Sequence, residues 1–145
     1  MKLYKPALIL LLIINSNLSV AQLNEFERDS LIRTLSLDSL INNYENLGLQ
    51  QSLPLVSEEA DKRLNHFYNE IMKRTGISDS SKNILKISQR NWIKYRDSEF
   101  QYISSQFEGL TGSMYPKITL IQQIKIVAHR AEELERYNML LLTRE

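Results

Sequence analysis

Apolar residues recur every three or four positions through most of this chain, the spacing that places them on one face of an α-helix. The spacing predicts four helical segments, which run roughly over residues 24–47, 58–75, 79–108 and 117–142. No useful run alternates strictly between apolar and polar residues, so strands are not expected. Long helices joined by short loops pack as antiparallel neighbours. The sequence therefore predicts an all-α fold, an antiparallel helical bundle of about four helices.

Polar residues and glycines at the ends of these segments support the predicted first and last residues of the helices. Ser57 is expected to cap the second segment and Gly76 to end it, while Ser78 or Asp79 can cap the third. The apolar stripe of the second segment consists of Ala60, Leu64, Phe67, Ile71 and Met72. The stripe of the fourth consists of Leu120 or Ile121, Ile124, Val127, Ala128, Ala131, Leu134 and Leu141.

The C-terminal run from Met139 to Leu142 is apolar on all sides of its helix. Such a run is either covered by another element or exposed as a contact surface. We expect burial against the first helix, with a dimer contact as the alternative.

The first 21 residues have the three parts of a secretory signal peptide. Two lysines precede Pro6, an apolar run follows to Ile14, and Ser19-Val20-Ala21 supplies the small residues of a cleavage site. The run is short for a membrane anchor, which needs roughly 20 apolar residues. We therefore expect a signal peptide at 1–21, an N-terminal helix and linker at 22–56, and a helical domain at 57–145. The cleaved protein would be exported, periplasmic or secreted, with no membrane span.

Composition narrows the classes of function. The 18 basic and 17 acidic residues nearly balance, which gives no support for a nucleic-acid partner. The chain has no cysteine, so no disulfide can form. His66 and His129 lie at no recognised metal spacing, and no nucleophile elbow, phosphate loop or zinc motif occurs. We predict a non-enzymatic protein with no catalytic residues, no cofactor and no metal.

The third segment places charged residues in line with the only tryptophan. Trp92, Arg96 and Glu99 share one helical face, and Arg96 and Glu99 are one turn apart, close enough to pair. We expect Trp92 to lie in the core and Arg96 to belong to a structural network, so that Arg96→Ala lowers the melting temperature. The alternative is a surface where Arg96 meets a carboxylate of a partner.

Two further expectations extend this network. Three polar residues on one side of the second segment are candidates to complete it: Asp61, Asn65 and Tyr68. Asp97 points away from Trp92, so we expect it to be exposed and to pair with Lys94 or Arg90.

The stretch from Gly109 to Pro116 is the better candidate for binding a partner, because loops held by rigid helices often carry recognition. The candidate residues are Thr111, Gly112, Ser113, Met114 and Tyr115. The alternative is a plain connection in which Gly112 ends one helix, Ser113 caps the next and Pro116 lies in its first turn. Both can hold at once.

Three stretches together resemble a bacterial family: Ala60–Tyr68, Ser88–Glu99 and Gly112–Pro116, followed by Arg130 and Leu134. Their order and spacing are similar to the domain named for the LprI-type lysozyme inhibitor, over roughly residues 57–137. The residues that match the motifs are Asp61, Leu64, Asn65, Tyr68, Trp92, Arg96, Asp97 and Glu99. The resemblance implies an exported, all-helical, non-enzymatic envelope protein.

The chain departs from the family at two positions. Relatives commonly carry cysteine directly after the second motif and early in the last helix, where this chain has Phe100 and either Ile121 or Gln122. The departure puts in doubt any role that needs a disulfide-tied domain.

Two functions follow. The first is a binding module that blocks a lysozyme or another cell-wall hydrolase. The second is a structural or interaction protein of the envelope with no lysozyme role, whose partner is another envelope protein.

Overall fold

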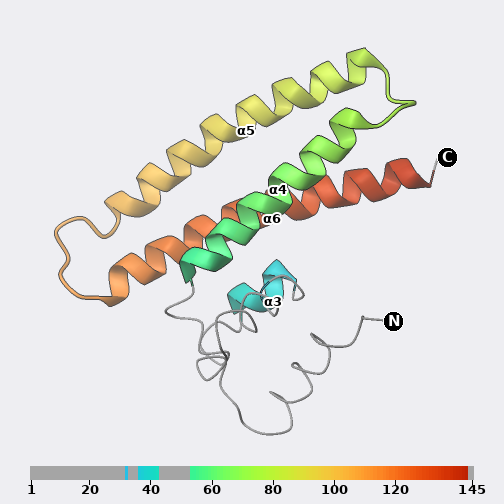
Figure 1. Ribbon diagram of the computed structural model, residues 1–145. Helices are drawn as coiled ribbons and strands as arrows, with labels where there is room; N and C mark the ends of the chain where they lie inside the picture. The colour runs from blue at the N-terminus through green and yellow to red at the C-terminus, as the bar shows by residue number, and fades with distance from the viewer. Residues whose placement is uncertain (1–31, 33–35, 43–52, 144–145) are drawn as a thin grey trace, which may run out of the picture. The chain divides into compact units, whose positions relative to one another are not determined.

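The computed structural model describes residue 32, residues 36–42 and residues 53–143 (Figure 1). Within these residues the chain forms four helices and no strand: α3 (Leu37–Asn42), α4 (Leu53–Lys73), α5 (Asp79–Ser105) and α6 (Met114–Leu142). The predicted all-α helical bundle is confirmed. The expected signal peptide and most of the expected first helix lie outside the described residues. No helix in the described ranges is long and apolar enough to cross a bilayer.

The chain divides into two compact units, residues 1–59 and 60–145. In the first unit, the Ser36 hydroxyl accepts a hydrogen bond from the Ser39 N–H at 3.1 Å, which caps the start of α3. Leu37, Leu40 and Ile41 of α3 are buried. Their spacing of three and four residues is that of one helical face.

The helix α4 begins at Leu53, five residues before the predicted start at Glu58. Pro54 lies in its first turn, where a proline costs little because the missing N–H has no partner inside the helix. Past the end of α4, Gly76 adopts a φ of 84°, as expected of a residue that stops a helix. In the second unit the stripe of α4 follows the prediction, since Ala60, Leu64 and Ile71 are buried.

The helix α5 begins at Asp79, with the Ser78 hydroxyl accepting a hydrogen bond from the Ser81 N–H at 3.2 Å. The predicted cap is therefore confirmed. The helix ends at Ser105 rather than Glu108, and a turn leads to Gly109, which has a φ of 78°. The left-handed backbone at Gly109 is incompatible with a continuing helix.

The helix α6 begins at Met114, three residues before the predicted start at Lys117. Ser113 occupies its N-cap position but makes no side-chain cap hydrogen bond, and Pro116 lies in the first turn. The buried residues of α6 follow the predicted stripe, with one charged addition: Ile121, Ile124, Val127, Ala128, Arg130, Ala131 and Leu134.

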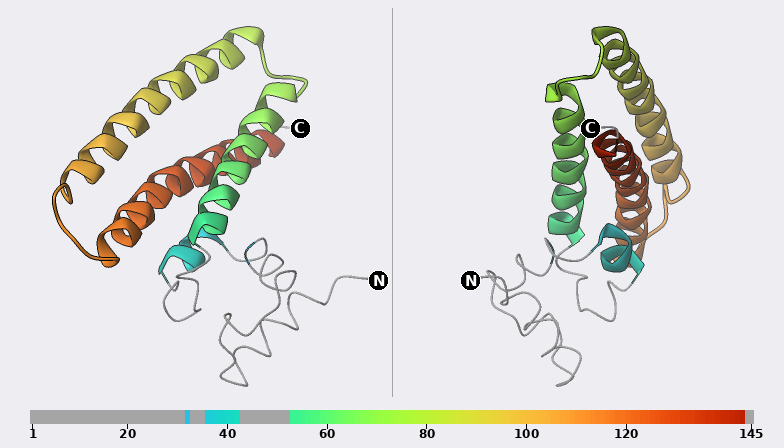
Figure 2. Two further views of the ribbon diagram at one scale, coloured as in Figure 1. Left: turned by 60° about the vertical axis from the view of Figure 1, so that its left-hand side comes forward. Right: turned by 90° about the vertical axis from the view of Figure 1, so that its right-hand side faces the viewer.

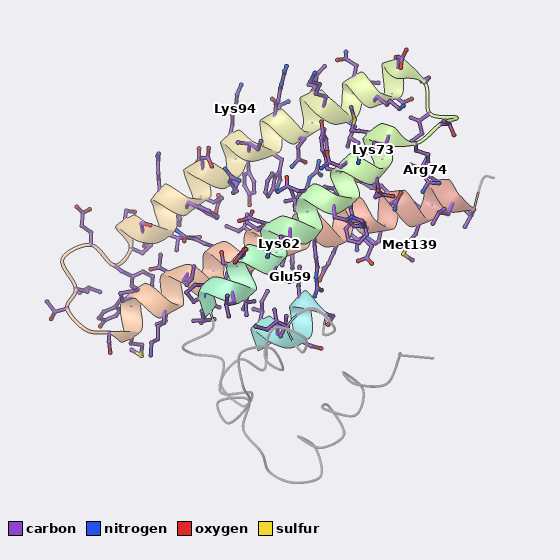
Figure 3. All side chains as sticks on the ribbon, viewed as in Figure 1. Glu59, Lys62, Lys73, Arg74, Lys94 and Met139 are labelled. Atoms are coloured by element: carbon purple, nitrogen blue, oxygen red, sulfur yellow. The ribbon has the colours of Figure 1, made fainter. Side chains whose placement is uncertain are left out.

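The three long helices alternate in direction, so α5 runs antiparallel to both α4 and α6 (Figure 1, Figure 2). Arg74, directly after α4, donates a hydrogen bond from Nη2 to Asn138 Oδ1 of α6 at 2.9 Å (Figure 3). The last turn of α6 therefore extends past the end of α4. This position explains why Met139, Leu140 and Leu142 are exposed, and the prediction that this run is buried is wrong.

Candidate functional site

A buried arginine connects α5 to α6. The Arg130 side chain is only 6% exposed, and its Nε donates a hydrogen bond to Gln89 Oε1 at 3.0 Å. Its Nη2 lies 3.3 Å from the Ser88 hydroxyl, and its Nη1 forms an ion pair with Glu133. A buried charge is tolerated when its donors are satisfied in this way. Gln89, the acceptor, is itself the buried residue of α5.

Glu133 joins this arginine to the surface. Tyr137 donates a hydrogen bond from its hydroxyl to Glu133 Oε1 at 2.7 Å. Partial burial favours the neutral acid, but the hydrogen bonds from Tyr137 and Arg130 and the positive charges of Arg130 and Arg136 outweigh it, so the pKa of Glu133 is lowered. The same hydrogen bond raises the pKa of Tyr137, because it stabilises the protonated phenol.

The network predicted around Arg96 has a different form. The Arg96 guanidinium pairs with Asp97 rather than Glu99, with Nη2 and Nε lying 2.7 and 2.9 Å from Asp97 Oδ1. Its centre also lies 5.4 Å from the ring centroid of Trp92 and 5.7 Å from that of Phe100, within cation–π range. The predicted Arg96–Glu99 pair is therefore wrong, because the carboxylate of the adjacent residue and two flanking rings hold the guanidinium.

The remaining predicted members of that network do not bond to Arg96. Asp61 and Asn65 are exposed on α4, and Tyr68 is half-buried. Asp97 is exposed, as expected, but its partner is Arg96 rather than Lys94 or Arg90. Leu64 lies in the core.

An open groove of about 620 Å³ runs between α5 and α6. Its α5 wall consists of Trp92, Tyr95, Glu99, Tyr102 and Ile103. Its α6 wall consists mainly of charged and polar residues: Gln122, Lys125, Ile126, His129, Arg130, Glu133 and Arg136. The predicted position of Trp92 in the core is wrong, since the indole is half-buried and forms part of this wall.

The loop between α5 and α6 contains the other predicted site. Thr111, Gly112 and Ser113 are exposed, and so is Met114 at the start of α6. Tyr115 behaves differently: it is half-buried, and its ring centroid lies 5.6 Å from that of Phe107. The Tyr115 side chain therefore packs against Phe107 at the base of the loop and does not project into solvent.

Gly112 is required by the shape of this loop. Its φ is 138°, a conformation that L side chains rarely adopt. A Cβ at this position would also lie 3.5 Å from Cε2 of Tyr115, in ordinary contact. The backbone strain, rather than a lack of space, favours glycine here.

Sequence reasoning identified Arg130 only as part of a resemblance and missed its role. A signal was present, because Arg130 follows Val127 by three residues and precedes Leu134 by four, which places it inside an apolar stripe. No group of three or more His, Asp or Glu residues in the described part of the chain is arranged to hold a metal ion.

The sequence model of a family described as lysozyme inhibitor LprI matches residues 42–134, which include α4, α5 and most of α6. No curated protein and no solved structure matches the chain.

Proposed function

The chain belongs to the LprI family, described as lysozyme inhibitors, and we propose that it is an exported, non-catalytic protein that blocks a lysozyme or another cell-wall hydrolase. The family match covers nearly the whole second unit and supports the proposal more than any other observation. The signal-peptide pattern of residues 1–21 supports export.

The α5–α6 loop is the element we propose to enter the hydrolase cleft. Glycoside hydrolases place a pair of carboxyl groups on either side of the bond they cleave. The loop offers hydroxyl donors at Thr111 and Ser113, and apolar side chains at Leu110 and Met114, all of them exposed. A few side chains near the centre of an interface contribute most of its binding energy, while the hydroxyls can satisfy polar groups at the rim.

The base of the loop supports the same proposal. The tilted rings of Phe107 and Tyr115 lie 5.6 Å apart at the base of the loop, and Gly109 and Gly112 adopt the positive φ angles that its turns require. A preordered loop loses less conformational entropy on binding than a loose one does.

The test is hydrolysis of cell walls by a purified lysozyme, titrated with residues 22–145. We expect inhibition that saturates, and about tenfold weaker inhibition when Leu110→Ala and Met114→Ala are combined. The matched control combines Ile84→Ala and Ile87→Ala, which remove two exposed apolar side chains from α5 and should leave inhibition unchanged. No inhibition at a large molar excess, by lysozymes of several classes, contradicts the proposal.

A second function is favoured by one specific observation. The end of α6 exposes three apolar side chains within about one helical turn: Met139, Leu140 and Leu142. Such a patch fits a structural or interaction protein of the envelope with no lysozyme role. Light scattering of the purified protein separates the two, because a strictly monomeric protein that inhibits lysozyme excludes this alternative.

A further inference from the structure

The groove between α5 and α6 presents aromatic rings on one wall. Tyr95 and Tyr102 are 54% and 61% exposed, and Trp92 is half-buried beside them. These three residues share one side of α5, and the helical rise places Trp92 and Tyr102 about 15 Å apart along the axis. Large aromatic side chains normally bury most of their surface. Here Tyr95 and Tyr102 are exposed in the wall of a concave site, and the Arg96 guanidinium lies over one face of the Trp92 ring.

The opposite wall provides charged groups that the fold does not use. Arg130 and Glu133 satisfy one another and the neighbouring polar groups, so they form a fixed part of the groove. Lys125 has no salt-bridge partner within the described ranges, and the same is true of Glu99 on the facing helix. The basic side chains that line the groove are Lys125, Arg130 and Arg136. They outnumber its two acidic side chains, Glu99 and Glu133.

A ligand for this groove needs flat apolar faces, hydrogen-bonding groups around its edge and at least one negative charge. A sugar ring has such faces in its C–H surfaces, which stack on aromatic side chains, and its hydroxyls can bond to Glu99 and Gln122. A carboxylate on the sugar fits Lys125 or Arg136, since charge-assisted hydrogen bonds are the stronger kind. An apolar peptide fits poorly, because Ile103 and Ile126 are the aliphatic residues among those that line the groove.

We propose that the α5–α6 groove binds a short carboxylate-bearing oligosaccharide, with Trp92, Tyr95 and Tyr102 stacking on sugar rings and Lys125 and Arg136 holding the carboxylate. The groove is a different surface from the loop that we propose to enter a hydrolase. Saccharide binding does not rest on lysozyme inhibition, and each can be disproved while the other stands.

The chain contains its own probe for this binding. Trp92 is the only tryptophan and lies in the groove wall, so its fluorescence reports on this site alone. The purified protein is titrated with three saccharides: the disaccharide of N-acetylglucosamine and N-acetylmuramic acid, the neutral disaccharide of N-acetylglucosamine, and oligogalacturonate. A poly-glutamate peptide serves as the acidic non-saccharide, and calorimetry with the same ligands detects binding that leaves the fluorescence unchanged.

We expect a saturable change in Trp92 emission with the acidic saccharides and weaker binding of the neutral one. The two acidic saccharides distinguish a cell-wall fragment from a uronic acid chain. The Lys125→Ala and Arg136→Ala variants should each weaken binding of the acidic sugars about tenfold and leave the neutral sugar nearly unaffected. The Tyr102→Ala variant should weaken binding of both kinds.

The controls remove similar side chains from elsewhere on α5. Ile93 lies on the far side of the helix from Tyr102, and Lys94 projects away from the other helices (Figure 3). Ile93→Ala and Lys94→Ala should bind the saccharides as the unaltered protein does. Absence of binding to every saccharide by both methods overturns the proposal. Equal binding by the groove variants and the controls, or tighter binding of poly-glutamate, overturns it as well.

Discussion

The helices α5 and α6 are nearly equal in length, with 27 and 29 residues, yet they have opposite roles in the fold. Seven residues of α6 are buried, whereas α5 buries Gln89. Apolar side chains of α5 that would normally be inside are exposed, among them Ile84, Tyr95 and Tyr102. The helix α6 therefore supplies most of the core of the unit, whereas α5 supplies much of its exposed surface.

Helical phase accounts for much of this difference. Ile84, Tyr95 and Tyr102 lie within about 20° of one another around the α5 axis, and Gln89 lies about 140° from Ile84. Gln89 contacts Arg130 of α6, so Ile84 lies outside this contact, while Tyr95 and Tyr102 line the groove beside it and stay exposed. The hydrogen bond between Gln89 and Arg130 therefore fixes the rotation of α5 about its axis. This rotation determines which apolar side chains of α5 are exposed.

The largest expected effect is the loss of a core side chain from α6. Leu134 is 0% exposed, so Leu134→Ala leaves a cavity and should lower the free energy of unfolding by about 2–5 kcal/mol. Ile84→Ala is the matched change on α5, and because that side chain is exposed we expect less than about 0.5 kcal/mol. Urea denaturation of both variants measures the difference. Equal losses contradict the division of roles between the two helices.

The next effect concerns the two arginines. Arg130→Ala should destabilise the protein by about 1–3 kcal/mol, because it leaves Gln89 without a donor. The loss is moderated because the Glu133 side chain is 36% exposed and can be hydrated. Arg96→Ala is the control: it removes a half-exposed pair and two ring contacts, and should cost about 0.5–1 kcal/mol.

Thermal unfolding of these two variants distinguishes the networks. Both melting temperatures should fall, with the larger decrease for Arg130→Ala. A larger decrease for Arg96→Ala would mean that the interactions within α5 stabilise the unit more than the contact between α5 and α6 does.

The smallest effect is a dependence of stability on pH. The folded chain lowers the pKa of Glu133, so its contribution is present above the ordinary value of 4.5 and is lost as the pH falls through the folded pKa. Tyr137 has a raised pKa, so its contribution is present below the ordinary value of 10.0 and is lost as the pH rises through the folded pKa.

Melting temperatures recorded from acid to alkaline pH test this pair. Glu133→Gln should reduce the fall in melting temperature at acid pH, the acid limb of the profile. Tyr137→Phe should reduce the fall at alkaline pH and, to a smaller extent, the fall at acid pH. An acid limb that is unchanged in Glu133→Gln shows that other carboxyl groups control it.

The sequence by itself determined the fold class, the three long helices and much of the core. The stripe from Ile124 to Leu134 and the cap at Ser78 were predictable because both depend on neighbours within one helix. Local rules were less successful at helix starts, where α4 and α6 begin several residues early. Both of these starts contain a proline, which the first turn accepts without loss.

Only the tertiary structure decided which arginine is buried and which face of α5 is open. Arg96 and Arg130 both lie in line with apolar residues, so periodicity treats them alike. Arg130 is satisfied by Gln89 and Ser88 of another helix, some forty residues earlier in the chain, whereas Arg96 is satisfied by its own neighbours. Helical phase shows which residues share a face, but the face that meets a partner is set by contacts between helices.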